Sequence, residues 1–296
     1  MEKEDFAIPF AYCDGKNDII DVANILNIQA YEFKELFGKN KILWTCKMKY
    51  SLEHNDKKYS NINLIDTFLK LGIKKGDILC VHTELFNFGM PLLPKNEFLQ
   101  TILDCFFEVI DKEVTLIMPT FTYSFCKNEV YDKLNSKTKV GILNEFFRKQ
   151  EGVKRTNDPI FSFTIKGAKE ELFLKDTTSC FWGNSVYDAL YKNNGKFITL
   201  GGVGNTLTHY AEECFGVDYC YHKIFKGKAI NEMKSLQDAK NSYYVRRLNK
   251  DSTPNLENII NIVSKSKNHK KIQFGGENIS IYNVKEYVKI LWITLF

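Results

Sequence analysis

The sequence predicts an α/β protein: a layered α/β/α arrangement with a largely parallel central sheet and an antiparallel extension. The first observation behind this class is that short apolar runs alternate with helical segments between residues 61 and 216, as expected for strands joined by crossover helices. The second is that 44% of the 296 residues are hydrophobic and 14% aromatic, which is enough for a substantial core. The third is that only six prolines interrupt the chain, which argues against disorder.

An N-terminal extension, residues 1–55, precedes the alternating region and is predicted to be mostly helical. The stretches NDIIDVANILNI and AYEFKELFG show helical spacing, with Gly38 as a C-cap, and KILWTCKMKY is typical of a strand. We expect residues 56–296 to form a single domain.

Within this domain, each periodic segment predicts a helix and each short apolar run predicts a strand. In chain order these are a helix at 63–72 closed by Gly72, a strand at 77–82, a helix at 95–110, a strand at 114–122, a helix at 140–150, a strand at 160–167, a helix at 185–193, a strand at 196–202 and the helix that carries His209. Beyond residue 217, we expect antiparallel strands at 217–230 and 242–248 and helices at 255–266 and 283–292, the first capped by the turn Ser252-Thr253-Pro254.

Composition limits the function classes. The net charge of +5 comes from 41 basic and 36 acidic residues that are mostly interspersed, so we expect no nucleic-acid partner. No apolar run reaches the roughly 20 residues that span a bilayer. The eight cysteines include no CxxC pair, and MEKEDF is not a signal peptide, so we expect a cytoplasmic protein with reduced thiols. The sequence leaves open whether the protein forms a homodimer.

Polar residues gather where predicted strands end, which is where open α/β sheets place their ligands. These segments contain His82 and Thr83, then Thr120, Thr122 and Tyr123, then Arg155, Asp158 and Ser162, and finally Asn205, Thr206, Thr208 and His209. Hydroxyl-rich segments at four strand ends predict one shared site.

His209 has the pattern of an oriented general base. Asn205 is a good N-cap, which would put His209 in the first or second turn of a helix, where the macrodipole favours a neutral imidazole. Glu212 and Glu213, three and four residues further on, lie on the same face, and either could bind one ring nitrogen. The alternative is a histidine that caps the helix or packs locally.

Three other interpretations of this segment carry less weight. The glycines of GGVGN could cradle a phosphate, but a complete GxGxxG is absent and a tight strand-to-helix turn is favoured. His209, Cys214, Cys220 and His222 could form a zinc set, but they lack the usual spacing, so we expect no metal. Cys214 as a nucleophile would point away from His209 around the helix.

Taken together, five motifs resemble the aminoglycoside 3-N-acetyltransferase family, acetyl-CoA-dependent enzymes outside the GNAT fold. They occur in the family's order across residues 60–225, the motif-bearing core: VHTELFNFG, LIMPTFTYSF, VGILNEFFRKQEGVKRTNDPIFSFTIKG, FWGNSVYDAL and FITLGGVGNTLTHYAEE. The resemblance implies the fold of that family and an acyltransferase that uses acetyl-CoA as co-substrate. Residues 1–55 lie outside it.

The resemblance also implies roles for individual residues. LTHYAE matches the catalytic histidine motif, with His209 as base and Glu212 beside it. His82 and Thr83 match the loop that binds the CoA pyrophosphate, and MPTFT nominates Thr120 and Thr122 beside the pantetheine. The substrate-binding candidates, at the acyl and acceptor end, are Tyr123, Asp158, Ser162 and Asn205.

The acceptor is expected to be an amino sugar, most specifically a nucleotide-linked sugar for surface glycans, as in the GDP-perosamine N-acetyltransferase type. Resistance enzymes typically have an acidic residue where this chain has Asn205, and a His-Pro pair where it has Asp158-Pro159. The segment YHKIFKGK with Arg246 and Arg247 is basic, which suits an anionic acceptor. The alternatives are an aminoglycoside antibiotic as acceptor, or an inactive scaffold or binding protein of the same fold.

Overall fold

A computed structural model describes residues 48–110, 114–202, 206–248 and 256–295. The chain divides into two compact units, the first formed by residues 1–72 and 89–109 and the second by residues 73–88 and 110–296. Most of the predicted N-terminal extension, including Gly38, lies outside the described residues, as do the turn at Ser252-Thr253-Pro254 and Asn205. The boundary at residue 55 therefore stays a prediction.

The first unit combines a small sheet with two helices. The sheet has the order β2-β1-β4, and the elements are β1 (Tyr50–His54), β2 (Lys57–Ser60), α4 (Asn61–Leu71), β4 (Met90–Pro91) and α5 (Lys95–Ile110). Helix α4 begins at a capping box on Ser60 and ends at Gly72, whose φ of 87° is the left-handed conformation of a C-cap. The rings of Phe68 and Phe106 stack at 4.3 Å and hold α4 against α5.

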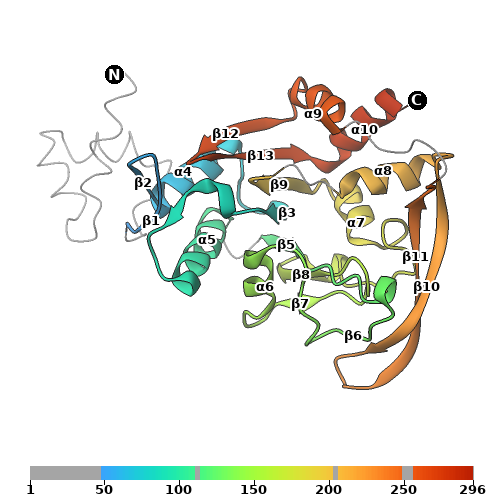
Figure 1. Cartoon of the computed structure of the whole chain (residues 1–296). Coiled ribbons are helices and arrows are strands. Elements are labelled where there is room, and N and C mark those ends of the chain that lie inside the picture. The colour runs from blue at the N-terminus through green and yellow to red at the C-terminus, as the bar shows by residue number, and fades with distance from the viewer. Residues whose placement is uncertain (1–47, 111–113, 203–205, 249–255, 296) are drawn as a thin grey trace, which may run out of the picture. The chain divides into compact units, whose positions relative to one another are not determined.

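The second unit is built on a seven-stranded sheet of order β12-β13-β9-β3-β5-β8-β7 (Figure 1). Its strands are β3 (Ile78–Thr83), β5 (Thr115–Pro119), β7 (Lys154–Arg155), β8 (Phe163–Gly167), β9 (Lys196–Leu200), β12 (Lys270–Phe274) and β13 (Glu277–Asn283). The central strands β9, β3 and β5 are parallel, whereas β8 and β13 flank them in antiparallel orientation. The predicted α/β class is confirmed, and its sheet is mixed.

The strand directions bring the predicted polar segments to one edge of this sheet. Parallel strands β3, β5 and β9 end at the same edge, since their residues pair in register. Strand β8 is antiparallel, and Phe163 at its beginning pairs with Pro119 at the end of β5. Ser162 therefore reaches the edge from the start of a strand, while Thr83 and Thr120 reach it from strand ends.

Helices and a long hairpin complete the second unit. The helices are α6 (Ile142–Arg148), α7 (Val186–Lys192), α8 (Leu207–Phe215), α9 (Leu256–Ser264) and α10 (Val284–Leu295), with short 3₁₀ turns at Phe86–Phe88, Phe125–Lys127 and Glu170–Leu172. Strands β10 (Cys220–Ile230) and β11 (Leu236–Arg246) form the hairpin, to which β6 (Tyr131–Asp132) adds a third strand. Among the described residues, no helix combines the length and apolarity needed to cross a membrane.

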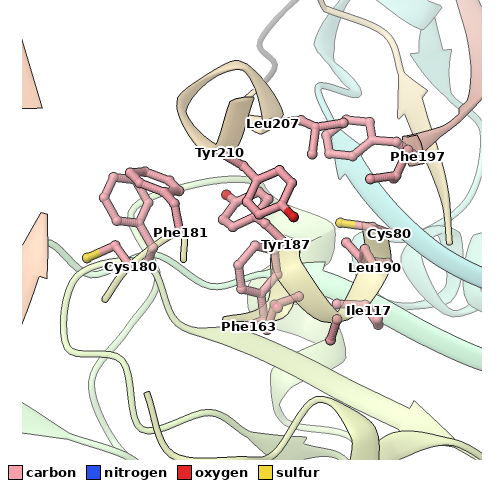
Figure 2. Close-up of a cluster of buried hydrophobic side chains, with 14 of the residues drawn as sticks. Cys80, Ile117, Phe163, Cys180, Phe181, Tyr187, Leu190, Phe197, Leu207 and Tyr210 are labelled. Carbon is pink, nitrogen blue, oxygen red and sulfur yellow. The ribbon is translucent and has the colours of Figure 1, made fainter. Parts of the chain in front are cut away.

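An aromatic core holds the helices that carry the candidate site. Figure 2 shows Phe163, Phe181 and Tyr187 clustered with Leu207 and Tyr210, which belong to α8. The Tyr187 ring contacts Phe163 at 5.2 Å and Phe181 at 5.3 Å. Helix α8 buries Leu207, Tyr210 and Ala211 at helical spacing against this cluster.

Candidate active site

Two glycines make the turn from β9 toward α8 possible. Gly201 and Gly202 have φ values of +70° and +65°, which side chains rarely adopt. A Cβ on Gly201 would lie 2.4 Å from the backbone oxygen of Glu84, whose N–H donates to the Leu200 carbonyl at 2.8 Å. The glycines therefore let the turn after β9 lie directly on the turn after β3, as the tight-turn interpretation predicts.

The first turn of α8 is tied to two neighbouring helices. The N-cap is Thr206, whereas the sequence predicted Asn205, which lies outside the described residues. The Thr206 hydroxyl is 2.5 Å from the phenol oxygen of Tyr187 on α7, and the Thr208 hydroxyl is 3.1 Å from that of Tyr287 on α10. His209, the third residue of the helix, thus stands on a fixed support.

His209 and Glu212 form a direct hydrogen bond. The imidazole Nδ1 lies 2.8 Å from Glu212 Oε2, the geometry expected for residues three apart on a helix. With an ionised Glu212, Nδ1 carries the proton and Nε2 keeps its lone pair. The His209 side chain is 22% exposed, whereas that of Glu212 is 1% exposed.

Glu212 is buried but fully bonded. Its Oε1 accepts a hydrogen bond from Arg246 Nη2 at 3.1 Å and one from the Tyr219 hydroxyl at 3.4 Å. Burial raises the pKa of the Glu212 carboxyl, but the hydrogen bonds and charges of His209 and Arg246 outweigh it, so the pKa is lowered overall. The carboxylate is therefore ionised at neutral pH.

Aromatic rings surround the imidazole of His209. The ring of Phe181 lies 5.3 Å away, centroid to centroid, and that of Tyr243 lies 6.4 Å away nearly edge-on. Apolar walls on two sides weaken dielectric screening and so strengthen the interaction with Glu212.

Glu213 has a separate set of partners. It accepts a hydrogen bond from the Ser179 hydroxyl at 2.9 Å and lies 3.9 Å from His222 Nδ1. Burial raises its pKa, partly offset by those two groups. Of the two glutamates that the sequence nominated, Glu212 is thus the one bonded to His209.

Neither a metal set nor a reactive thiol forms around His209. Across the described residues, no group of three or more His, Cys, Asp or Glu side chains could hold a metal ion. Burial raises the pKa of Cys214 to about 12, so this cysteine is a thiol at neutral pH and a poor nucleophile.

Thr120 and Ser162 belong to a buried network around Arg155. The Thr120 hydroxyl donates to the Ser162 carbonyl at 3.2 Å, and the Ser162 hydroxyl donates to the Thr120 carbonyl at 2.6 Å. Arg155, 4% exposed, donates to the same Thr120 carbonyl at 2.7 Å and to the Ser136 carbonyl at 2.6 Å. This network fixes the end of β5 against the start of β8.

Thr122 and Asp158 stabilise the neighbouring loop. The Thr122 hydroxyl donates to the Pro159 carbonyl at 2.9 Å. Asp158 accepts from the backbone N–H groups of Ile160 and Phe161 at 2.7 and 2.8 Å. Burial raises the Asp158 pKa, and these hydrogen bonds offset part of the increase. Both side chains are buried, and their hydrogen bonds stabilise the backbone around them.

His82 and Thr83 end strand β3 side by side. The Thr83 hydroxyl donates to Asn144 Oδ1 at 2.8 Å, and Asn144 in turn donates to the Pro119 carbonyl at 2.8 Å. The His82 ring lies 4.5 Å from that of Phe197, and its buried Nε2 has no hydrogen-bond partner among the described residues. Burial lowers the pKa of His82 to about 3, so this imidazole is neutral.

A series of ring contacts connects His82 with His209. His82 contacts Phe121 at 6.2 Å, Phe121 contacts Phe161 at 5.0 Å, and Phe161 contacts Phe181 at 4.9 Å. Tyr123, which has a φ of 55°, also packs on Phe161, at 5.5 Å. His82, Tyr123 and His209 thus border one continuous series of aromatic rings, although the His209–Glu212 pair is the part with an evident chemical capability.

A known protein family matches most of this chain. The model of the aminoglycoside 3-N-acetyltransferase family matches residues 80–293. The chain belongs to this family. The membership confirms the predicted resemblance and the prediction of an N-acetyltransferase, and it extends the match well beyond residue 225. No curated protein sequence is similar enough to the chain to match it.

Solved structures share the aminoglycoside 3-N-acetyltransferase fold with this chain. AAC-VIa bound to sisomicin has a TM-score of 0.68 and 17% identity, and the alignment covers 80% of this chain and 98% of that one. AAC-IIIb in a binary complex with CoASH has a TM-score of 0.66 and 18% identity, with coverages of 79% and 96%. YokD from Bacillus subtilis has the same TM-score and identity, with coverages of 80% and 100%.

Arg246 is one of the residues around the His209–Glu212 pair whose contact the sequence did not reveal. It lies 34 positions after Glu212, in a segment that the sequence describes only as basic. The nearest signal is the two adjacent arginines at the end of a predicted strand, which does not specify a partner.

Proposed function

We propose that the protein transfers the acetyl group of acetyl-CoA to an amine of an aminoglycoside, with His209 as general base. The observation that carries this proposal is the His209–Glu212 hydrogen bond of 2.8 Å on a helix fixed at its first turn. It places an imidazole, oriented by a buried carboxylate, in a family that acetylates amines.

The chemistry follows from the state of the acceptor. An amine at pH 7 is mostly ammonium and cannot attack a thioester until it loses a proton. Nε2 of His209 takes that proton, Glu212 stabilises the imidazolium, and the free amine attacks the thioester carbonyl. The C–S bond then breaks, and the nitrogen loses its second proton as it becomes the amide. Of the two protons released, one passes from His209 to the CoA thiolate and the other to solvent. Binding both substrates side by side makes a covalent enzyme intermediate unnecessary.

Acetyl-CoA would bind along the edge where β3 and β5 end. Thr83 can still accept a hydrogen bond at the oxygen that donates to Asn144, and His82, whose Nε2 is buried, would support this edge through its ring contact with Phe197. Thr120 and Thr122 would shape the pantetheine path through the backbone they hold, because both hydroxyls are committed to carbonyls. The complex of AAC-IIIb with CoASH supports the same co-substrate here.

The charges of the described residues favour a cationic acceptor over a nucleotide-linked sugar. Arg246 is neutralised by Glu212 at 3.1 Å, and Lys228 by Asp238 at 3.1 Å. The basic segment therefore carries less free positive charge than its sequence suggests. Glu213 offers a buried carboxylate whose Oε2 has no partner among the described residues, and carboxylates attract polycations.

The comparisons support the same choice of acceptor. AAC-VIa was solved with sisomicin bound, and a mutant of AAC(3)-IVa was solved with a gentamicin bound. Among the remaining candidates, Tyr123, Asp158 and Ser162 would act at the acceptor end. Asp158 and Ser162 would do so by fixing the loop that faces the substrate, since both are buried.

A thiol-release assay separates the two acceptor classes. Purified protein would be incubated with acetyl-CoA and either kanamycin-like aminoglycosides or amino-sugar nucleotides, and CoA thiol would be measured. We expect turnover with the aminoglycosides. Turnover with the sugar nucleotides alone would show that the acceptor is a nucleotide-linked amino sugar and not an aminoglycoside. If the protein binds CoA by calorimetry but releases CoA thiol with neither class of acceptor, the proposed function is refuted.

A further inference from the structure

We infer that Arg246 is a positioning residue that keeps Glu212 ionised and thereby fixes which ring nitrogen of His209 can act as the base. This inference rests on the proposed function and adds to it a residue of the β10–β11 hairpin. The His209–Glu212 pair alone would leave one oxygen of a buried carboxylate without a cationic partner.

The contacts of Glu212 divide cleanly between its two oxygens. Oε2 faces His209 Nδ1, and Oε1 faces Arg246 Nη2 at 3.1 Å and the Tyr219 hydroxyl at 3.4 Å. The Glu212 side chain is 1% exposed, while that of Arg246 is 29% exposed. The guanidinium therefore brings its charge to the carboxylate without being fully buried itself, which keeps its own desolvation cost low.

The other titratable groups that face Glu212 are neutral at pH 7. Burial raises the pKa of Cys220 and of Tyr287 to about 12, and burial likewise raises that of Tyr219. Arg246 is thus the permanent cation bonded to Glu212, and together with His209 it lowers the pKa of that carboxyl against the effect of burial.

The protonation state of Glu212 decides the tautomer of His209. An ionised carboxylate can only accept, so Nδ1 must donate and Nε2 keeps the lone pair that takes a proton from the acceptor. A protonated Glu212 would donate to Nδ1 instead, and the ring proton would move to Nε2. The imidazole would then lack a basic nitrogen toward the substrate.

The hairpin delivers Arg246 and Tyr219 together. Arg246 ends β11 and pairs with Cys220 at the beginning of β10, while the N–H of Arg247 donates to the Tyr219 carbonyl at 2.8 Å. The Tyr244 hydroxyl donates to the Val217 carbonyl at 2.7 Å, which joins the hairpin to the segment after α8. The base of the hairpin is therefore a rigid support for Glu212.

Steady-state kinetics provide the first test. Arg246→Met and Arg246→Gln remove the charge, and the glutamine keeps an N–H donor and a polar side chain in case the methionine variant does not fold. We expect kcat at pH 7 to fall about tenfold in both variants, with the KM for acetyl-CoA unchanged. The kcat should recover as the pH is raised, because a Glu212 carboxyl without the nearby charge ionises at a higher pH. Arg246→Lys should restore kcat to within about threefold of wild type.

The adjacent arginine offers a matched control. Arg247 donates to the Asp218 carbonyl at 3.1 Å and stacks on the Tyr221 ring, so Arg247→Met should keep the wild-type kcat and pH profile. Wild-type kcat in Arg246→Gln would overturn the inference. If Arg246→Lys and Arg246→Gln lose kcat equally and at every pH, the inference is also overturned, because the role of Arg246 would then be structural.

Nitrogen NMR of ¹⁵N-histidine-labelled protein provides a test that does not depend on turnover. The His209 signals, assigned with His209→Gln, should report a proton on Nδ1 in the wild type and a shift toward Nε2–H in Arg246→Gln at pH 7. Identical tautomers in the two proteins would overturn the inference even if the acceptor assigned above were wrong. A tautomer change in a protein that acetylates nothing would instead leave the inference standing and refute the proposed function.

Discussion

The neutral, buried imidazole of His82 predicts a loss of stability in mild acid that one substitution should remove. His82 is partly buried, and its Nε2 is sealed from solvent without a partner among the described residues. In the folded protein burial lowers its pKa from the usual 6.5 to about 3. As the pH falls below 6.5, the unfolded chain therefore binds a proton that the folded protein does not, and folding loses free energy.

The size of this loss follows from the two pKa values. At 1.36 kcal/mol per pH unit, the contribution lost is about 2 kcal/mol at pH 5 and approaches about 5 kcal/mol near pH 3. Above pH 6.5 the contribution of the neutral His82 to the unfolding free energy is fully present. Most carboxylates stay ionised down to about pH 5. Comparison with a variant that lacks the imidazole separates the contribution of His82 from those of other groups that titrate between pH 7 and pH 5.

Urea unfolding at pH 7, 6 and 5 would measure the effect. The wild type should lose about 2 kcal/mol of unfolding free energy from His82 across this interval, whereas His82→Phe, which keeps a ring against Phe197, should lose correspondingly less. His222→Gln is the matched control, because its side chain is 58% exposed, and it should keep the wild-type slope. Equal slopes in the wild type and His82→Phe would refute the conclusion that the imidazole is held neutral.

Further predictions concern the base and the turn before it. His209→Ala should lower kcat by about 10²–10⁴, with CoA affinity by calorimetry unchanged, and an unchanged kcat would remove it from the mechanism. Glu212→Gln should lower kcat by about tenfold or more at every pH, because an amide cannot stabilise an imidazolium; a normal kcat would show that the hydrogen bond has no catalytic role. Gly201→Ala should cost about 2–4 kcal/mol in unfolding free energy, since its Cβ would lie 2.4 Å from the Glu84 carbonyl oxygen at a φ of +70°. Gly216→Ala, at a φ of +62° in open space, should cost only about 1 kcal/mol, and equal losses would contradict the close approach at Gly201.

Local patterns made much of this structure predictable. Helix α8 combines a glycine turn and apolar residues at helical spacing, so neighbouring residues predict the element. They also predict a carboxylate partner for His209, although spacing alone leaves Glu212 and Glu213 open. Gly72 likewise ends its helix where the sequence predicts. Such features depend on contacts within one or two turns of chain.

Long-range pairing was less predictable, for a physical reason. The apolar run of β8 fits a parallel or an antiparallel neighbour equally well, because strand direction is set by the connection and not by composition. The β12–β13 hairpin was not predicted at all, although GG at residues 275–276 is a known hairpin signal. Thr120 and Ser162 were correctly placed at one edge, but their commitment to Arg155 depends on three-dimensional packing.

Single-turnover mass spectrometry of both the acceptor and the intact protein tests the central claim most directly, namely that His209 promotes direct transfer of the acetyl group to an amine. With acetyl-CoA and kanamycin, the wild type should yield acceptor carrying one added acetyl group and protein of unchanged mass, while His209→Ala should yield almost none of that product in the same time. An acetyl group on the protein that then passes to the acceptor would contradict direct transfer, and equal product from His209→Ala would contradict the role of the base.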